Sequence, residues 1–141
     1  MKILIMGLPG SGKTALAKAL QKKLKCLWFN ADTVREQFND WDFSHNGRIR
    51  QSERMRDLAN SSSNESKYVI VDFIAPIQET RDIFDADFTV WVNRIETSIY
   101  QNTNNLFEKP IKCDVEILPG FTVKEEVALV CQKLNDTFRD L

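Results

Sequence analysis

The sequence begins with a short apolar run, Lys2 to Met6, that leads directly into a glycine-rich turn. The eight residues of this turn are Gly7, Leu8, Pro9, Gly10, Ser11, Gly12, Lys13 and Thr14. They match the pattern G-x-x-x-x-G-K-[ST] at every fixed position. The regularly spaced leucines that follow predict a helix from Thr14 to Leu24. A strand, a tight turn and a helix in this order predict an α/β fold.

The composition of the turn suits an anionic ligand. Glycines let the backbone curl so that successive amides point at phosphate oxygens, and the start of the helix adds partial positive charge. Lys13 is expected to reach the β- and γ-phosphates of ATP, and the Thr14 hydroxyl to ligate the Mg²⁺ that bridges them. We therefore interpret residues 7 to 14 as a P-loop. The alternative, a glycine-rich turn that arises by chance, is disfavoured by the strand and helix around it.

Four further apolar or alternating runs predict strands, and they cover Cys26 to Phe29, Tyr68 to Val71, Phe88 to Val92 and Val115 to Leu118. Two more helices are expected, one over about Arg48 to Ala59 with Ser44 as its cap, and one over Val123 to Leu141. The polar stretch Asn60 to Ser66 between them predicts a surface loop. Strands that alternate with helices imply a parallel sheet with its ligands at the carboxyl ends of the strands.

Length, charge and cysteine content narrow the class of protein. A chain of 141 residues suits a single domain, residues 1–141. The net charge of -1 provides no basic field, so long nucleic acid is not favoured as a partner. Cys26, Cys113 and Cys131 are odd in number and far apart, which predicts neither disulfides nor a zinc site and favours the cytoplasm. The first apolar run is too short for a signal peptide or a membrane span.

Charged side chains follow the second predicted strand. Asp32 and Arg35 stand in the segment Asn30 to Arg35, at the edge of the sheet where the P-loop is expected. Asp32 would orient or deprotonate an attacking hydroxyl, or hold a water bound to Mg²⁺. The alternative for Asp32 is a helix N-cap, where aspartate is favoured. Arg35 would bind an anionic acceptor through paired hydrogen bonds.

A second acid, Asp72, ends the apolar run Tyr68 to Val71. An acid in this position is typical of the carboxylate that supports Mg²⁺ in P-loop proteins, and we interpret Thr14 and Asp72 as the metal-site residues. The alternative is a turn residue, because aspartate often stands where a strand ends.

An aromatic residue and several arginines lie between these two acids. Phe43 with Arg50 and Arg54, which are one helical turn apart, would seat a nucleotide-like anion by stacking and charge. The alternative is a solvated helix face on which the arginines pair with Glu53 and Asp57.

With these residues in view, the chain resembles the adenylylsulfate (APS) kinases, which use ATP and Mg²⁺ to phosphorylate the 3′-hydroxyl of adenosine 5′-phosphosulfate. The resemblance covers about residues 3 to 110. Besides the P-loop, the family segments D-G-D-N-x-R, L-N-x-D-L-G-F-S, S-F-I-S-P-Y-R and R-D-P-K-G-L-Y-K-K correspond to Asn30 to Arg35, Phe38 to Ser44, Asp72 to Gln78, and Gln101 to Lys109.

The resemblance implies a fold and a set of roles. The fold is a three-layer α/β domain like that of nucleoside monophosphate kinases, with a five-stranded parallel sheet in the order 2-3-1-4-5 and a lid near residues 101 to 110. Lys13 and Asp32 are the catalytic residues, and the partner is a small APS-like nucleotide. The family allows a homodimer. By the same resemblance the substrate contacts are Asp32, Arg35, Phe43, which stacks on adenine, Arg48, Gln51 and Ile74.

The chain departs from the family pattern most strongly in the lid. The replacements are Asn30 for aspartate, Gln51 for asparagine, Asp72 for serine, Gln101 for arginine and Asn104 for lysine. The loss of two lid cations is expected to slow chemistry or to loosen closure over the nucleotide. Two alternatives follow: a P-loop kinase for another hydroxyl acceptor, such as a polynucleotide 5′-hydroxyl or a small molecule, and a nucleotide-binding protein that has lost catalysis.

Overall fold

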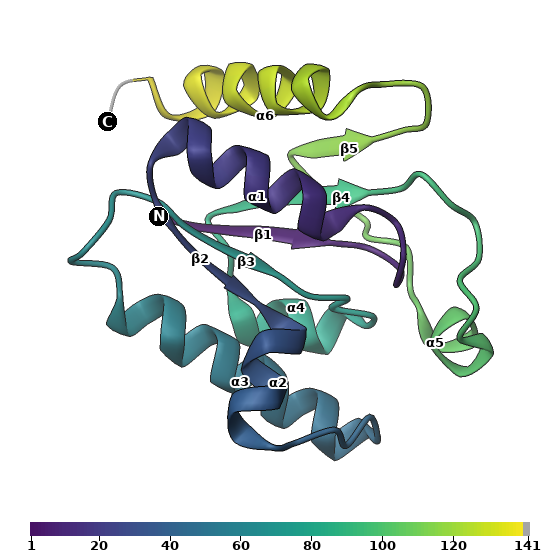
Figure 1. Ribbon diagram of the computed structural model, residues 1–141. Coiled ribbons are helices and arrows are strands. Elements are labelled where there is room, and N and C mark those ends of the chain that lie inside the picture. The colour runs from purple at the N-terminus through teal and green to yellow at the C-terminus, as the bar shows by residue number, and fades with distance from the viewer. Residues whose placement is uncertain (140–141) are drawn as a thin grey trace.

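The computed structural model describes residues 1–139, which form three layers: one parallel sheet between two layers of helices (Figure 1). The five strands are β1 (Lys2–Met6), β2 (Leu27–Asn30), β3 (Val69–Asp72), β4 (Phe88–Val92) and β5 (Val115–Ile117). They lie in the order β2-β3-β1-β4-β5, and each neighbouring pair is parallel. The predicted fold class and strand order are confirmed, with β2 and β3 each shifted by one residue toward the carboxyl end.

Helices cover both faces of the sheet (Figure 1). One face carries α1 (Lys13–Leu24) and α6 (Val123–Phe138), and the other carries α3 (His45–Ser61) and α4 (Gln78–Phe84). The short helices α2 (Ala31–Phe38) and α5 (Gln101–Leu106) stand at the side of the molecule to which the carboxyl ends of the strands point. Leu141, the end of the last predicted helix, lies outside the described residues.

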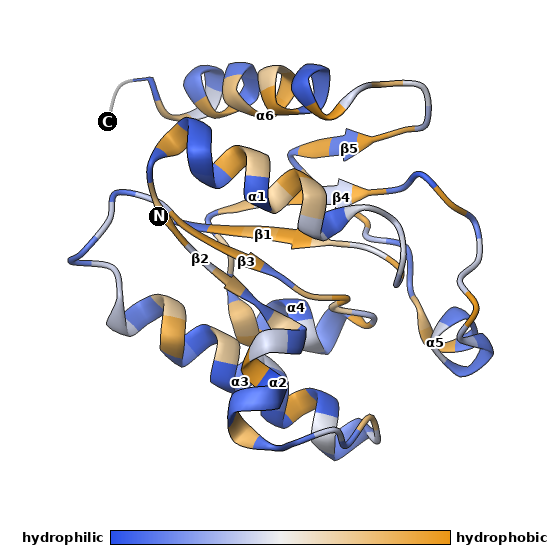
Figure 2. Cartoon of the chain, in the orientation of Figure 1, coloured by the Kyte–Doolittle hydropathy of each residue, from blue (hydrophilic) through white to orange (hydrophobic). Residues whose placement is uncertain are grey.

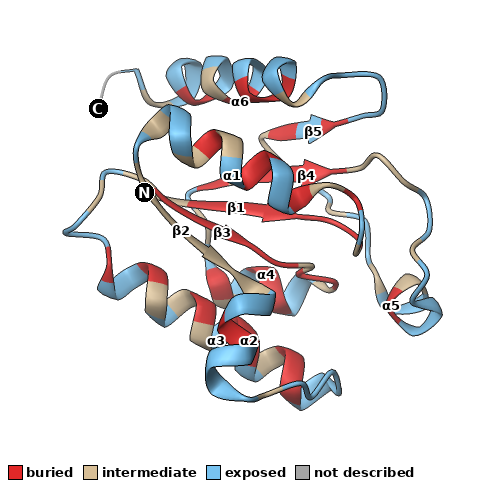
Figure 3. Cartoon of the chain, in the orientation of Figure 1, coloured by how far each residue is buried: buried red, intermediate tan, exposed pale blue. Residues whose placement is uncertain are grey.

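The core consists of two clusters, one on each face of the sheet, because side chains along a strand alternate between faces. Ile3 and Ile5 of β1 belong to the cluster that packs against α1 and α6, whereas Leu4 and Met6 belong to the one under α3 and α4. Strands β1, β3 and β4 are therefore mostly apolar and almost wholly buried (Figures 2 and 3). This rigid centre places the turn after β1 at the carboxyl edge of the sheet.

The helix boundaries follow from their caps. The Ser44 hydroxyl accepts a hydrogen bond from the Gly47 amide at 3.2 Å, which confirms the predicted cap of α3. The α3 helix then continues to Ser61, into the segment expected to be a loop. No helix within residues 1–139 is both long enough and apolar enough to cross a membrane.

Candidate active site

The turn after β1 is held tightly at its two ends. A Cβ at Gly7 would lie 2.5 Å from the Val92 carbonyl oxygen, so no side chain fits there. Gly12 has φ of +100°, and its Cβ would collide with the Arg94 guanidinium. Inside the turn, the Ser11 hydroxyl is buried and has no hydrogen-bond partner within residues 1–139. The turn thus has the backbone conformation that a phosphate cradle requires.

Lys13 begins α1 and points back into the turn. Its Nζ donates a hydrogen bond to the Leu8 carbonyl oxygen at 2.9 Å, and its side chain is buried. Burial lowers the pKa of Lys13 to about 8, although the charges of Asp72 and Asp32 oppose this shift. An ammonium group that is desolvated in this way is stabilised by any polyanion that enters the turn.

Asp72 is the last residue of β3, and its side chain is directed at the P-loop through Asn30. The Asn30 amide nitrogen lies 3.0 Å from Asp72 Oδ1 and 3.3 Å from Thr14 Oγ1, and it donates to both. The Trp28 indole N–H donates to Asp72 Oδ2 at 2.5 Å. Burial raises the pKa of Asp72. Asp72 is therefore a buried strand residue, and its interpretation as a turn residue is wrong.

Asn30, not Asp32, is the N-cap of α2. Strand β2 ends at Asn30, one residue later than expected, and α2 begins at the next residue. The Asn30 side-chain oxygen accepts a hydrogen bond from the Thr33 amide at 3.0 Å. The interpretation of Asp32 as an N-cap is therefore wrong. Asp32 lies in the first turn of α2, where its exposed carboxylate lines the same cleft as Lys13.

Arg35 and Arg48 flank Phe43 in another part of the cleft. The Phe43 ring centroid is 4.2 Å from Arg35 Cζ and 5.5 Å from Arg48 Cζ, and 47% of Phe43 is exposed. Both arginines are buried, and burial lowers the pKa of each because desolvation penalises the charged form. A bound anion would relieve that penalty. This part of the cleft thus offers an aromatic ring between two guanidinium groups.

Arg48 and Gln51 connect α3 to its neighbours. Arg48 Nη2 donates to Thr103 Oγ1 of α5 at 3.2 Å, which links α5 to the part of the cleft around Phe43. Gln51 Nε2 donates to the Ala31 carbonyl oxygen at 3.2 Å, and its Oε1 accepts from Arg54 at 2.7 Å. Both polar groups of Gln51 are therefore engaged within the protein, although the residue lines the cleft.

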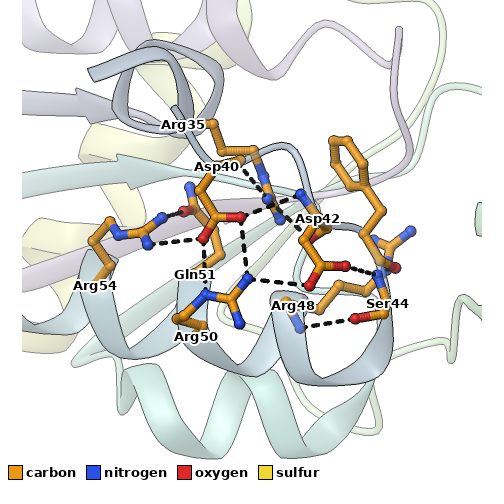
Figure 4. Close-up of polar contacts among 10 residues, drawn as sticks. Arg35, Asp40, Asp42, Ser44, Arg48, Arg50, Gln51 and Arg54 are labelled. Carbon is orange, nitrogen blue, oxygen red and sulfur yellow. Dashed lines mark hydrogen bonds and ion pairs between the residues drawn. The ribbon is translucent and has the colours of Figure 1, made fainter. Parts of the chain in front are cut away.

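Arg50 and Arg54 form an ionic network around Asp40 (Figure 4). Arg50 Nε and Arg54 Nη2 each lie 2.9 Å from Asp40 Oδ2, and Arg50 also reaches Asp42 at 3.1 Å. Hydrogen bonds from the two arginines hold the pKa of Asp40 well below its usual range. Arg50 and Arg54 both pair with Asp40, and neither lines the cleft. The expected binding of an anion by these arginines and their expected pairing with Glu53 and Asp57 are therefore both wrong.

One cleft of about 1550 Å³ joins the P-loop to Asp32, Arg35, Phe43 and Arg48. It brings together most of the residues expected from the sequence, but Gly7, Leu8 and Ser11 are not among the residues that line it. Trp41 also lines the cleft, and sequence reasoning missed it. The expected residues that line the cleft are Pro9, Gly10, Gly12, Lys13, Thr14, Asp32, Arg35, Phe43, Arg48, Gln51, Asp72 and Ile74.

The segment from Thr97 to Thr103, which includes the start of α5, closes one side of the cleft. No side chain of residues 97 to 107 carries a charge. The segment after α5 is anchored instead by backbone contacts: the Glu108 amide donates to the Pro76 carbonyl oxygen at 2.7 Å, and Arg81 donates to the Glu108 carbonyl oxygen. Residues 97 to 103 therefore contribute neutral polar and apolar groups to the cleft.

The sequence of this chain is similar to a family of known proteins and to individual relatives. The chain matches the family model described as Adenylylsulphate kinase over residues 1–124. It is 30% identical over 127 residues to a probable adenylyl-sulfate kinase of Pseudomonas aeruginosa, which covers 82% of this chain and 58% of that protein. It is 28% identical over 121 residues to the cytidine diphosphoramidate kinase of Campylobacter jejuni, with 82% and 62% covered. The chain thus spans about three fifths of the length of these relatives.

Solved structures share the fold. The Mycobacterium tuberculosis APS kinase in complex with AMPPNP and APS superimposes with a TM-score of 0.81 at 19% identity, over 95% of this chain and 96% of that one. The shikimate kinase of Aquifex aeolicus gives a TM-score of 0.68 at 16% identity, over 97% and 98% of the two chains. The match of residues 1–124 to the family model confirms the resemblance seen in the sequence: the chain belongs to the adenylylsulphate kinase family.

Proposed function

We propose that this chain is an ATP-dependent kinase that converts ATP and adenosine 5′-phosphosulfate to ADP and 3′-phosphoadenosine 5′-phosphosulfate. The observation that carries the proposal is the single cleft that runs from the P-loop to the ring of Phe43 between Arg35 and Arg48. The first end suits a polyphosphate, and the second suits an anion attached to an aromatic base. Membership of the family supports the same reaction.

On the donor side, the P-loop amides and Lys13 bind the triphosphate of ATP. Lys13 Nζ leaves the Leu8 carbonyl oxygen for the phosphate oxygens, where it balances charge on the transferred group. Thr14 and Asp72 suit Mg²⁺, because a hydroxyl and a carboxylate are hard oxygen groups already joined through the Asn30 amide. When bound, Mg²⁺ would neutralise charge on the β- and γ-phosphates.

On the acceptor side, Asp32 aligns the 3′-hydroxyl and takes its proton as the new bond forms. The hydroxyl oxygen attacks the γ-phosphorus of ATP, the bond from that phosphorus to the bridging oxygen breaks, and ADP leaves. Arg35 and Arg48 hold the phosphosulfate, and Phe43 stacks on the base. Gln51 and Ile74 complete the wall of this part of the cleft.

An acceptor screen that measures ADP release tests this proposal directly. APS, cytidine diphosphoramidate, nucleosides and oligonucleotides would each be added to the chain with ATP and Mg²⁺. We expect ADP release coupled to APS above that of every other acceptor. If ATP binds but no acceptor gives turnover, the chain is a nucleotide-binding protein rather than a kinase.

A kinase for a different acceptor is the second candidate. The relative in Campylobacter jejuni is a cytidine diphosphoramidate kinase, and it covers as much of this chain as the adenylyl-sulfate kinase relative does. The lid also departs from the APS kinase pattern, because Gln101 and Asn104 replace two of its cations. In the same screen, faster ADP release with the cytidine nucleotide than with APS would assign this reaction. A homodimer and a cytoplasmic location remain predictions.

The affinity for ATP is expected to fall as the pH rises above about 8. In the free protein Lys13 loses its proton near this pH, and only the protonated side chain attracts the triphosphate. Bound phosphates raise the pKa of Lys13, so ATP binding takes up a proton, and the dissociation constant should rise by up to about tenfold per pH unit. Calorimetry from pH 7 to pH 9.5 measures this. A flat profile, equal to that of Lys13→Met, would contradict the assignment.

The variant Asp72→Asn is expected to need about 10–100-fold more Mg²⁺ for tight ATP binding, because a carboxylate beside the metal site is lost. Asparagine has nearly the same shape and can still accept the Trp28 hydrogen bond. The measurement is ATP affinity as a function of Mg²⁺ concentration. Asp57→Asn, the same change on the exposed face of α3, is the control. An unshifted Mg²⁺ requirement in Asp72→Asn excludes a role at the metal.

A further inference from the structure

Arg94 and Glu126 form an ion pair just outside the P-loop. Arg94 lies in the segment after β4, and Glu126 lies in the first turn of α6. Arg94 Nε donates to Glu126 Oε2 at 2.8 Å, and Nη2 donates to Oε1. The Glu126 side chain is fully buried, whereas Arg94 keeps part of its surface exposed. A buried carboxylate is costly without a partner, so this pair fixes the guanidinium in one place.

The third nitrogen of the same guanidinium contacts the P-loop. Arg94 Nη1 lies 3.4 Å from the Ser11 carbonyl oxygen, to which it donates. The guanidinium also packs so closely on Gly12 that a Cβ at that residue would collide with it. Arg94 therefore touches the peptide unit between Ser11 and Gly12, and it is not among the residues that line the cleft, so it lies outside the turn.

Contact with this peptide unit has a consequence for the inside of the turn. The peptide is trans, as are all those described, so the Ser11 carbonyl and the Gly12 N–H point in opposite directions. Because Arg94 holds the Ser11 carbonyl toward the outside of the turn, the Gly12 N–H points toward the inside, where a phosphate would bind. Amides that are oriented before the ligand arrives bind it without a cost of reorganisation.

We propose that Arg94, held by Glu126, is a positioning residue that orients the Gly12 amide for polyphosphate binding. This inference rests on the proposed function only in requiring that the P-loop binds the triphosphate. Glu126 lies beyond residues 1–124, the part of the chain that the family model matches. Helix α6 thus stabilises the nucleotide cradle through one buried carboxylate.

The test compares two ligands, ATP and inorganic tripolyphosphate, each with Mg²⁺. Tripolyphosphate has no base or sugar, so its affinity reports on the cradle alone. Arg94→Lys keeps a positive charge beside Glu126, but an ammonium cannot make the paired contact and also reach the Ser11 carbonyl oxygen. We expect both affinities to fall about tenfold, as for the loss of one charge-assisted hydrogen bond. The KM for ATP should rise while that for the acceptor stays constant.

A second variant separates positioning from folding. The double variant Arg94→Met, Glu126→Leu removes the pair together and leaves no unpaired buried charge, so it should fold and melt close to the wild type. It should also bind both ligands about tenfold more weakly. Arg56→Lys is the matched control, because Arg56 pairs with Asp57 on the surface of α3, and its affinities should not change.

Each other outcome overturns the inference in a recognisable way. If the double variant binds tripolyphosphate as well as the wild type does, Arg94 only fastens α6 to the sheet. If ATP binding weakens while tripolyphosphate binding does not, Arg94 acts on the nucleoside and not on the cradle. If the wild-type chain binds neither ligand, the proposed function fails, and this inference fails with it.

Discussion

Lys13→Ala is expected to lower turnover by about 10²–10³-fold, the loss typical of one electrostatic contact made to the transferring group. The ammonium group already lies inside the turn, 2.9 Å from the Leu8 carbonyl oxygen and buried from water. With a lid that contains no charged side chain between residues 97 and 107, few other cations of this chain can balance the charge on the phosphoryl group. Steady-state ADP release measures the effect.

A matched change on the same helix controls for folding. Lys18 is exposed on α1, and Lys18→Ala should retain the turnover and melting temperature of the wild type. Turnover of Lys13→Ala within a factor of about three of the wild type, well inside the loss expected for a transition-state contact, would refute the catalytic assignment of Lys13.

Asp32→Asn is expected to lower turnover by about 10²–10⁴-fold, the range for loss of a positioned general base. Asparagine keeps the shape of the side chain but cannot accept the proton of the acceptor hydroxyl. ATP affinity should change little, because the proposed role of Asp32 is to contact the acceptor and not the triphosphate. Single-turnover measurements at saturating ATP and acceptor isolate this chemical step.

The control for this variant is Glu36→Gln, which changes an exposed acid one turn further along α2. Its turnover should equal that of the wild type. If Asp32→Asn transfers the phosphoryl group at an undiminished rate, Asp32 neither aligns nor deprotonates the acceptor, and its exposed position in α2 has another explanation.

The sheet could be predicted because its signals are local. Each strand is a short apolar or alternating run, and the glycines of the P-loop indicate backbone conformations that other residues avoid. The sequence predicts neither α4 nor α5 and indicates α2 only through the alternative N-cap at Asp32, since six to eight residues carry too little periodicity to show one face. Their positions are set by packing against elements that are distant in sequence.

The errors in the site have the same physical origin. Asp40, which takes both Arg50 and Arg54, precedes α3 and is brought to it by the turn after α2, so the spacing rule for helical ion pairs could not identify it. The burial of Asp72 under Trp28 depends on the pairing of β2 with β3. The contact of Arg94 with Glu126 joins residues far apart in the chain, so no local sequence pattern predicts it.

The central claim is that the turn from Gly7 to Thr14 encloses the triphosphate of ATP, and a crystal structure with AMPPNP and Mg²⁺ tests it most directly. We expect the β-phosphate within hydrogen-bond distance of the backbone amides of residues 10 to 14. We also expect Lys13 Nζ to have moved from the Leu8 carbonyl oxygen to the phosphate oxygens. A triphosphate bound elsewhere, with Lys13 still on the Leu8 carbonyl oxygen, would contradict the central claim.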